Sequence, residues 1–330
     1  MEFKREFFDP DEEVTFRKKP AAPQRTGDRR DGQVYVPTDK IILTVNAALA
    51  TGRPLLIEGP PGSGKSSLAP YIAKKLGWWY YERVVTSRTT AQDLLWEYDA
   101  LRRLSDAQTR GRMRGREAYV EPGVLWWTFS PSSARRVVNV TRGVAARDPG
   151  RPGTEPEAVL LLDEIDKADP DVPNDLLVPL GSREFFVREA NMGVKAERSF
   201  LLILTTNGER ELPAAFIRRC VRLKLEQHTS DELVRIAQEH FDPKQENPKQ
   251  ESLYRALANW LVNEREAASQ RREREPSTAE YLDAIRAILE LRGTSGVPER
   301  FDGLEWKRFF EAVVLKVEPP GEEVDEEEVG

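Results

Sequence analysis

Short apolar runs alternate with helical periodicities through the first two thirds of the chain. Residues 55–57, 159–162 and 200–204 are apolar at successive positions and too short for helices, so they predict strands covered on both faces. The aromatic and β-branched residues 78–86 predict a further strand. Residues 38–50 repeat apolar side chains every three or four positions, which predicts a helix. The alternation predicts a three-layer α/β domain around a parallel sheet.

The last third of the chain is helical in pattern. Thr229 with Glu232, and Ser277 with Glu280, have the spacing of capping boxes, and each pair precedes a helical repeat. Further helices are predicted over residues 253–261 and 302–315. The predicted domains are a charged, flexible N-terminal arm (1–34), an α/β domain (35–227), a smaller all-α lid (228–317) and a disordered acidic tail (318–330).

Composition excludes several kinds of site. With 330 residues, 32% of them charged, and a net charge of −6, the chain is typical of a globular protein of about two domains, and its charge gives no global argument for nucleic-acid binding. Cys220 is the only cysteine and His228 and His240 are the only histidines, which excludes an intrachain disulfide or thiolate cluster and disfavours a histidine-based centre. No apolar run approaches the roughly 18 residues of a membrane span, and the N-terminus lacks a signal-peptide core, so we expect a cytoplasmic protein.

A glycine-rich loop joins the first predicted strand to the next helix. The pattern G-x-x-x-x-G-K-[ST] is met at every fixed position of GPPGSGKS, from Gly59 to Ser66. Such a loop turns its backbone N–H groups around a phosphate, which requires the positive φ that glycine permits. We expect Lys65 to reach the β- and γ-phosphates and the Ser66 hydroxyl to bind Mg²⁺. The predicted nucleotide-binding residues are Gly59, Pro60, Pro61, Gly62, Ser63, Gly64, Lys65, Ser66 and Ser67.

Two carboxylates follow the apolar residues 159–162. Asp163 and Glu164 stand at the carboxyl end of the predicted strand, the edge at which α/β sheets bind ligands. Asp163 would hold Mg²⁺ through water, and Glu164 would polarise the attacking water. Neighbouring strand residues point to opposite sides, so the two carboxylates can serve ion and water separately. Together with the phosphate loop, the pair predicts nucleotide hydrolysis.

These motifs resemble those of the AAA+ ATPases, and most closely those of the MoxR-like branch. The resemblance covers residues 35–290 and rests on GPPGSGKS, LLLDEIDKA, LLILTTN and ELPAAFIRRCVRL. It implies that Asn207 is sensor 1, which orients the attacking water; a cap at a strand end is the structural alternative. It also implies an arginine finger, Arg218 or Arg219, that stabilises the γ-phosphate charge in the neighbouring subunit, with a salt bridge as the alternative. Arg219 matches the family position better, although Cys220 stands where an aromatic residue is common.

The resemblance implies ATP and Mg²⁺ as ligands, and the lack of an Asn-Lys-x-Asp motif favours ATP over GTP only mildly.

One residue that the family usually has, the sensor 2 arginine, is missing from its expected position. The sensor 2 arginine usually follows a Ser-x pair at the start of the third lid helix, but here Ser277, Thr278 and Ala279 are followed by Glu280. Arg286, one to two turns further on, is a candidate replacement.

Two inserts are implied by the same resemblance. Hairpins are expected over residues 94–127 and 185–198, and in related motors they face the central pore. The first contains an arginine-dense segment, for which a solvated surface, an acidic polypeptide and a phosphate backbone all remain open. Residues 124–129, an aromatic run, favour core or subunit interface over a base-stacking platform. The arginines of the segment are Arg102, Arg103, Arg110, Arg112, Arg114 and Arg116.

The function implied by the resemblance is ATP-driven remodelling of a protein partner by a homo-oligomeric ring, hexameric by analogy. Partners of MoxR-like ATPases commonly carry a von Willebrand factor A domain. A McrB-like nucleic-acid motor working with a separate nuclease is one alternative, and a nucleotide-switched scaffold is another. The sequence shows no nuclease motif or separate DNA-binding domain, and no membrane role is expected.

Overall fold

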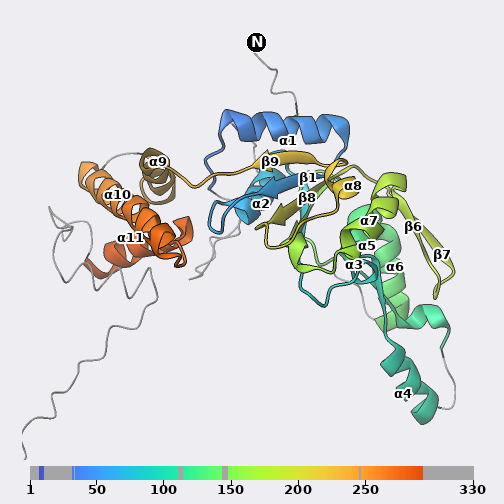
Figure 1. Cartoon of the computed structure of the whole chain (residues 1–330). Coiled ribbons are helices and arrows are strands. Elements are labelled where there is room, and N and C mark those ends of the chain that lie inside the picture. Colours follow the sequence, from blue (N-terminus) through green and yellow to red (C-terminus); the bar gives the residue numbers. More distant parts are fainter. Residues whose placement is uncertain are drawn as a thin grey trace, which may run out of the picture. The chain divides into compact units, whose positions relative to one another are not determined.

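The computed structural model describes residues 7–10, 32, 34–110, 114–142, 148–244 and 247–292. The chain divides into two compact units (Figure 1). The first comprises Met1–Pro60 and Lys65–Leu225, and the second comprises Pro61–Gly64 and Glu226–Gly330. Among the helices that the structure describes, none is long and apolar enough to cross a membrane.

A five-stranded parallel sheet forms the centre of the first unit (Figure 1). Its order is β2-β5-β8-β1-β9, so β1 and β5, which precede the phosphate loop and the paired carboxylates, lie on either side of β8. All three apolar runs that predicted buried strands lie in this sheet. The strands are β1 (Leu55–Glu58), β2 (Trp79–Val84), β5 (Ala158–Asp163), β8 (Phe200–Thr206) and β9 (Val221–Lys224).

Helices cover both faces of the sheet. Successive strand residues point to opposite faces, so Leu55 and Ile57 lie in one apolar core and Leu56 lies in the other. The first core is closed by α1 (Asp39–Thr51) and α2 (Lys65–Leu76). The second is closed by α3 (Ala91–Leu95), α5 (Val124–Phe129), α6 (Pro131–Arg142) and α7 (Asp171–Ser182). The predicted three-layer α/β fold is confirmed.

Two antiparallel hairpins project from this unit, in the two stretches where the resemblance implies inserts. In the first, β3 (Trp96–Tyr98) pairs with β4 (Val120–Pro122), and the chain between them forms α4 (Ala100–Arg110) and the 3₁₀ helix η1 (Arg116–Tyr119). In the second, β6 (Glu184–Val187) pairs with β7 (Met192–Lys195).

The two hairpins contact each other through Trp96. Its ring stacks on Phe185 with centroids 5.8 Å apart, and its Nε1 donates a 3.0 Å hydrogen bond to Glu189 Oε2. The aromatic run predicted to be core or interface lies in α5, where Trp126 and Trp127 are buried in the core. Of the arginine-dense segment, Arg114 and Arg116 are exposed, and Arg112 lies outside the described residues.

The second unit is helical where the structure describes it. It contains α9 (Ser230–Phe241), α10 (Pro248–Arg271) and α11 (Thr278–Arg292), packed around one apolar core. Both predicted capping boxes form: Thr229 with Glu232 at α9, and Ser277 with Glu280 at α11. The predicted helix over 302–315 and the acidic tail lie outside the described residues.

Part of the predicted N-terminal arm is described, and there it is docked. Phe8 is 1% exposed, and its ring meets Tyr71 edge-on with centroids 6.2 Å apart. Asn46 Oδ1 accepts 2.9 Å hydrogen bonds from the N–H groups of Phe7 and Phe8, and Asn46 Nδ2 donates to Phe8 O. Residues 7–10 are therefore anchored to the α/β unit, while most of residues 1–34 lie outside the described part.

Candidate active site

The glycine-rich loop connects β1 directly to α2. Gly62 and Gly64 have φ of 75° and 84°, a left-handed conformation that L side chains rarely adopt, so the loop requires glycine at both positions. Lys65 and Ser66 begin α2, at the end of the helix where unpaired backbone N–H groups favour anions. All nine predicted nucleotide-binding residues, 59–67, thus lie in one strand–loop–helix connection.

The Lys65 side chain lies against the loop that precedes it. Its Nζ donates to Gly59 O at 2.6 Å and to Pro60 O at 2.8 Å. Burial lowers the pKa of Lys65, because it disfavours the charged ammonium. The neighbouring carboxylates that oppose this effect on the pKa are those of Asp163, Asp166 and Glu164. The sheet edge therefore concentrates negative charge beside one buried lysine.

Asp163 ends β5 and is 3% exposed. Its Oδ1 accepts a 2.7 Å hydrogen bond from Ser66 Oγ, so the two predicted metal ligands lie together. The same oxygen accepts a 2.6 Å hydrogen bond from Thr205 Oγ1 on β8. Because β5 and β8 are adjacent and parallel, their carboxyl ends bring these side chains to the same edge of the sheet.

Glu164 follows Asp163 in a left-handed conformation, with φ of 61° and ψ of 50°. Its N–H donates to Thr205 Oγ1 at 2.8 Å, which ties the turn to β8. Asn207 Nδ2 donates to Glu164 Oε1 at 3.4 Å, so the structure brings together the two residues that the resemblance assigns to sensor 1 and to the activation of water. Lys167 Nζ donates to Glu164 Oε2 at 2.8 Å, and this hydrogen bond raises the pKa of Lys167. Glu164, Lys167, Glu209 and Arg210 line one side of a hollow of about 290 Å³.

Three residues of this group were not singled out from the sequence: Thr205, Asp166 and Lys167. Thr205 is fully buried, and Asp166 is 2% exposed. Asp166 lies in the 3₁₀ helix η2 (Ile165–Lys167), and its Oδ2 accepts from the N–H groups of Asn207 and Glu209 at 3.2 and 3.0 Å. The adjacency of β5 and β8 would have pointed to Thr205, but the sequence gives no local signal for the Asp166 contacts.

The donor set around Ser66 fits a magnesium ion. Mg²⁺ prefers hard oxygen ligands and usually takes one or two protein groups beside substrate phosphates and water. The Ser66 hydroxyl and the Asp163 carboxylate are such ligands and lie 2.7 Å apart. Among the described residues, no group of three or more His, Cys, Asp or Glu side chains could hold a metal ion by itself. Metal binding here would therefore depend on nucleotide phosphates.

Arg218 and Arg219 lie elsewhere on the α/β unit. They follow the short helix α8 (Ala214–Ile217), and both side chains are exposed. Neither guanidinium group has a hydrogen-bond or ion-pair partner among the described residues. Arg53 Nε donates to Arg219 O at 3.0 Å and Arg53 Nη2 donates to Arg218 O, so the backbone of this turn is held while the two side chains remain accessible.

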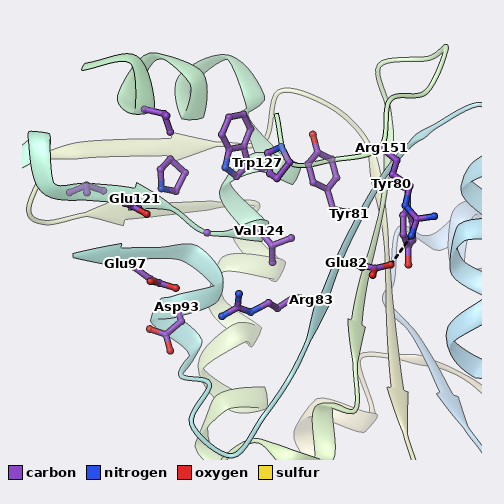
Figure 2. A pocket seen from close by; sticks show the side chains of 15 residues that line it. Tyr80, Tyr81, Glu82, Arg83, Asp93, Glu97, Glu121, Val124, Trp127 and Arg151 are labelled. Carbon is purple, nitrogen blue, oxygen red and sulfur yellow. Dashed lines mark hydrogen bonds and ion pairs between the residues drawn. The ribbon is translucent and has the colours of Figure 1, made fainter. Parts of the chain in front are cut away.

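A separate hollow of about 500 Å³ lies beside β2 (Figure 2). Trp127 and Val124 line it from α5, Glu97 from β3 and Arg83 from β2. An ion pair of 3.0 Å between Glu82 and Arg151 stands at one side of it. Neither the phosphate loop nor the paired carboxylates line this hollow, so it is distinct from the predicted site.

The position of the missing sensor 2 arginine is occupied by a capping carboxylate. Glu280 is 5% exposed, its Oε2 accepts from Ser277 N at 2.7 Å, and its Oε1 accepts from Arg274 at 2.6 Å. Arg286, the candidate replacement, pairs with Asp283 at 3.0 Å. Within the helical unit, both residues therefore have local partners.

A parallel sheet with a phosphate loop after β1 and carboxylates after β5 defines a P-loop nucleotide-binding domain. The sequence of this chain matches the protein family described as the AAA domain, dynein-related subfamily. The match covers residues 54–220, which are 167 of the 330 residues. The chain therefore belongs to the dynein-related AAA family.

Curated relatives are more distant and longer. The Lon protease of Syntrophus aciditrophicus is 27% identical over 305 residues, covering 79% of this chain and 34% of that protein. The Escherichia coli Lon protease is 27% identical over 198 residues, which cover 58% of this chain and 20% of that protein. The chain thus spans about a third or less of these relatives. Among solved structures, two RuvB chains of Thermotoga maritima align over 83% and 82% of this chain at 15% and 16% identity, with TM-scores of 0.44 and 0.41.

Proposed function

We propose that this protein is a Mg²⁺-dependent ATPase of the MoxR-like type, which assembles into a ring and uses ATP hydrolysis to remodel or activate a protein partner. The observation that supports hydrolysis most directly is the hydrogen-bonded series from Ser66 through Asp163 and Thr205 to Glu164, with Asn207 against the last carboxylate. This grouping at one edge of the sheet supports the proposed roles of Ser66 and Asp163 as the metal-binding pair, Glu164 as the base and Asn207 as the orienting amide.

In this mechanism the phosphate loop and Lys65 bind the phosphates and offset their charge. Ser66 and Asp163 would hold a Mg²⁺ ion, and the chemistry it would supply is neutralisation of charge on the phosphoryl oxygens. Glu164 accepts the proton of the attacking water, and Asn207, which contacts the same carboxylate, orients that water. Lys167 bonds the second Glu164 oxygen, which leaves Oε1 on the Asn207 side to meet the water.

Assembly is supported by the two arginines after α8. Arg218 and Arg219 are exposed and lack side-chain partners among the described residues, as a finger directed at another subunit requires. A guanidinium supplied in trans stabilises the charge of the phosphoryl transition state, and isolated subunits then hydrolyse slowly. This role supports a homo-oligomeric ring, which the resemblance implies is hexameric.

A nucleic-acid motor is the second candidate. The exposed Arg114 and Arg116 favour contact with an anionic surface, which suits a phosphate backbone or an acidic protein. Base stacking by the aromatic run is disfavoured, because Trp126 and Trp127 are 0% and 5% exposed. We therefore rank protein remodelling first, with a von Willebrand factor A domain as the partner to seek.

The test uses Glu164→Gln to hold ATP without hydrolysis. The variant is recovered from native lysate with and without ATP, beside Glu155→Gln, which changes an exposed carboxylate outside the site. A protein that co-purifies with Glu164→Gln only in the presence of ATP, and that stays bound after nuclease treatment, supports remodelling. Nucleic acid that stays bound at physiological salt, where non-specific phosphate contacts weaken, supports the motor.

A further inference from the structure

The turn that carries Asn207 is built around one buried carboxylate. After β8, Gly208 has φ of 76°, which turns the chain so that the N–H groups of Asn207 and Glu209 converge. Alternating right- and left-handed residues form such a concavity of N–H groups, and it binds anions. Here the bound group is the Asp166 carboxylate, whose Oδ2 accepts hydrogen bonds from Asn207 N at 3.2 Å and from Glu209 N at 3.0 Å. Hydrogen bonds from backbone N–H groups to a buried charged acceptor are among the stronger ones in proteins.

We propose that Asp166 is a positioning residue, which fixes this turn against the Glu164 segment and so places the Asn207 amide on Glu164. Asp166 and Glu164 are two residues apart, so the carboxylate that binds the turn and the carboxylate that meets Asn207 lie on one short segment, the 3₁₀ helix η2 and the residue before it. A second contact supports the same junction, because Arg210 Nη1 donates to Ala168 O at 3.3 Å. This inference rests on the proposed hydrolytic function.

The second carboxylate oxygen of Asp166 indicates that folding stability alone does not explain this residue. Asp166 Oδ1 is buried and accepts no hydrogen bond from any described residue. A buried acceptor without a partner costs stability, typically about 1–3 kcal/mol. This cost offsets part of the stability gained through Oδ2, so the residue is better explained by the turn that Oδ2 holds than by folding stability. Its charge also acts on Lys65, whose pKa it raises against the effect of burial.

The experiment compares Asp166→Ala with Asp166→Asn, which retains an oxygen for the two N–H groups. Asp175→Ala, an exposed carboxylate on α7, is the matched control. We expect Asp166→Ala to lower kcat for ATP by about tenfold or more with little change in nucleotide affinity, which is the pattern of a lost transition-state interaction. Asp166→Asn should recover much of the loss, and Asp175→Ala should match the parent.

A double-mutant cycle identifies the route of the effect. If Asp166 acts through Asn207, adding Asp166→Ala to Asn207→Ala lowers kcat no further, because the two residues serve one interaction. Full additivity would overturn the inference, as would a parallel fall of kcat, ATP affinity and melting temperature in Asp166→Ala alone.

Hydrogen exchange separates this inference from the proposed function. Asp166→Ala should speed amide exchange in a peptide spanning residues 205–210, and unchanged exchange there refutes the positioning role. A parent protein without ATP turnover refutes the proposed function, and the role of Asp166 with it. Turnover in the parent that Asp166→Ala leaves unchanged refutes only the role of Asp166.

Discussion

Thr205→Val is the sharpest single perturbation of the predicted site. Valine has nearly the same shape, so the change removes one hydroxyl at a fully buried position and leaves no large cavity. The hydroxyl donates to Asp163 Oδ1 at 2.6 Å and accepts from Glu164 N at 2.8 Å. A hydrogen bond to a charged group contributes about 1.5–3 kcal/mol, and a buried N–H left unpaired costs about 1–3 kcal/mol. We therefore expect a loss of about 2.5–6 kcal/mol in the free energy of unfolding, as the sum of those two effects.

The same change should slow hydrolysis, because Asp163 and Glu164 lose their common anchor. Chemical denaturation measures the stability and a coupled phosphate-release assay measures kcat. Thr205→Ser restores the hydroxyl and should return both quantities toward those of the parent. If Thr205→Val unfolds at the same denaturant concentration as the parent and hydrolyses ATP at the same rate, the hydrogen-bonded series does not carry the function assigned to it.

Three further predictions concern the arginine turn and the helical unit. Arg219→Ala should lower ATP turnover at least tenfold. Mixing it with Glu164→Gln subunits should restore part of the turnover, because the Glu164→Gln subunit supplies Arg219 to a neighbour that retains Glu164. No recovery on mixing contradicts a finger in trans. Burial lowers the pKa of His228 below the ordinary histidine value of about 6.5, so the folded state favours neutral imidazole. The stability that this contributes is full above about pH 6.5 and falls as the pH drops below that value. His228→Gln should flatten this dependence in melting curves between pH 7.5 and 5.5, and an unchanged slope refutes the assignment. Arg265→Met should destabilise the helical unit by about 1–3 kcal/mol, because Arg265 Nε donates to Pro276 O at 2.8 Å and the buried carbonyl would lose its partner; an unshifted denaturation midpoint counts against this.

The strands and helices could be predicted because their signals are local. The apolar runs at β1, β5 and β8 are read from consecutive residues, and the capping boxes at Thr229 and Ser277 from residues three apart. The phosphate loop is likewise a contiguous pattern, and its geometry follows from two glycines of positive φ. The hairpin inserts were implied by resemblance, and their antiparallel pairing is present.

The contacts that complete the site could not be read in this way. Thr205 reaches Asp163 across two strands separated by about forty residues, and the strand order that makes them neighbours is a property of the whole sheet. Asp166 binds backbone N–H groups of the Asn207 turn, which carry no residue type for a motif to specify. Lys167 contacts Glu164 three residues away, a spacing too common in helical segments to indicate a catalytic role.

The central claim is that Glu164 acts as the base of ATP hydrolysis at the edge of the sheet. The most direct measurement is ATP turnover at saturating Mg²⁺ for the parent and Glu164→Gln, with ATP affinity measured in parallel for both. We expect the parent to hydrolyse ATP, and we expect Glu164→Gln to bind ATP as tightly as the parent but to turn it over about 10²–10⁴-fold more slowly, the usual contribution of a general base. Turnover in Glu164→Gln equal to that of the parent would contradict the claim.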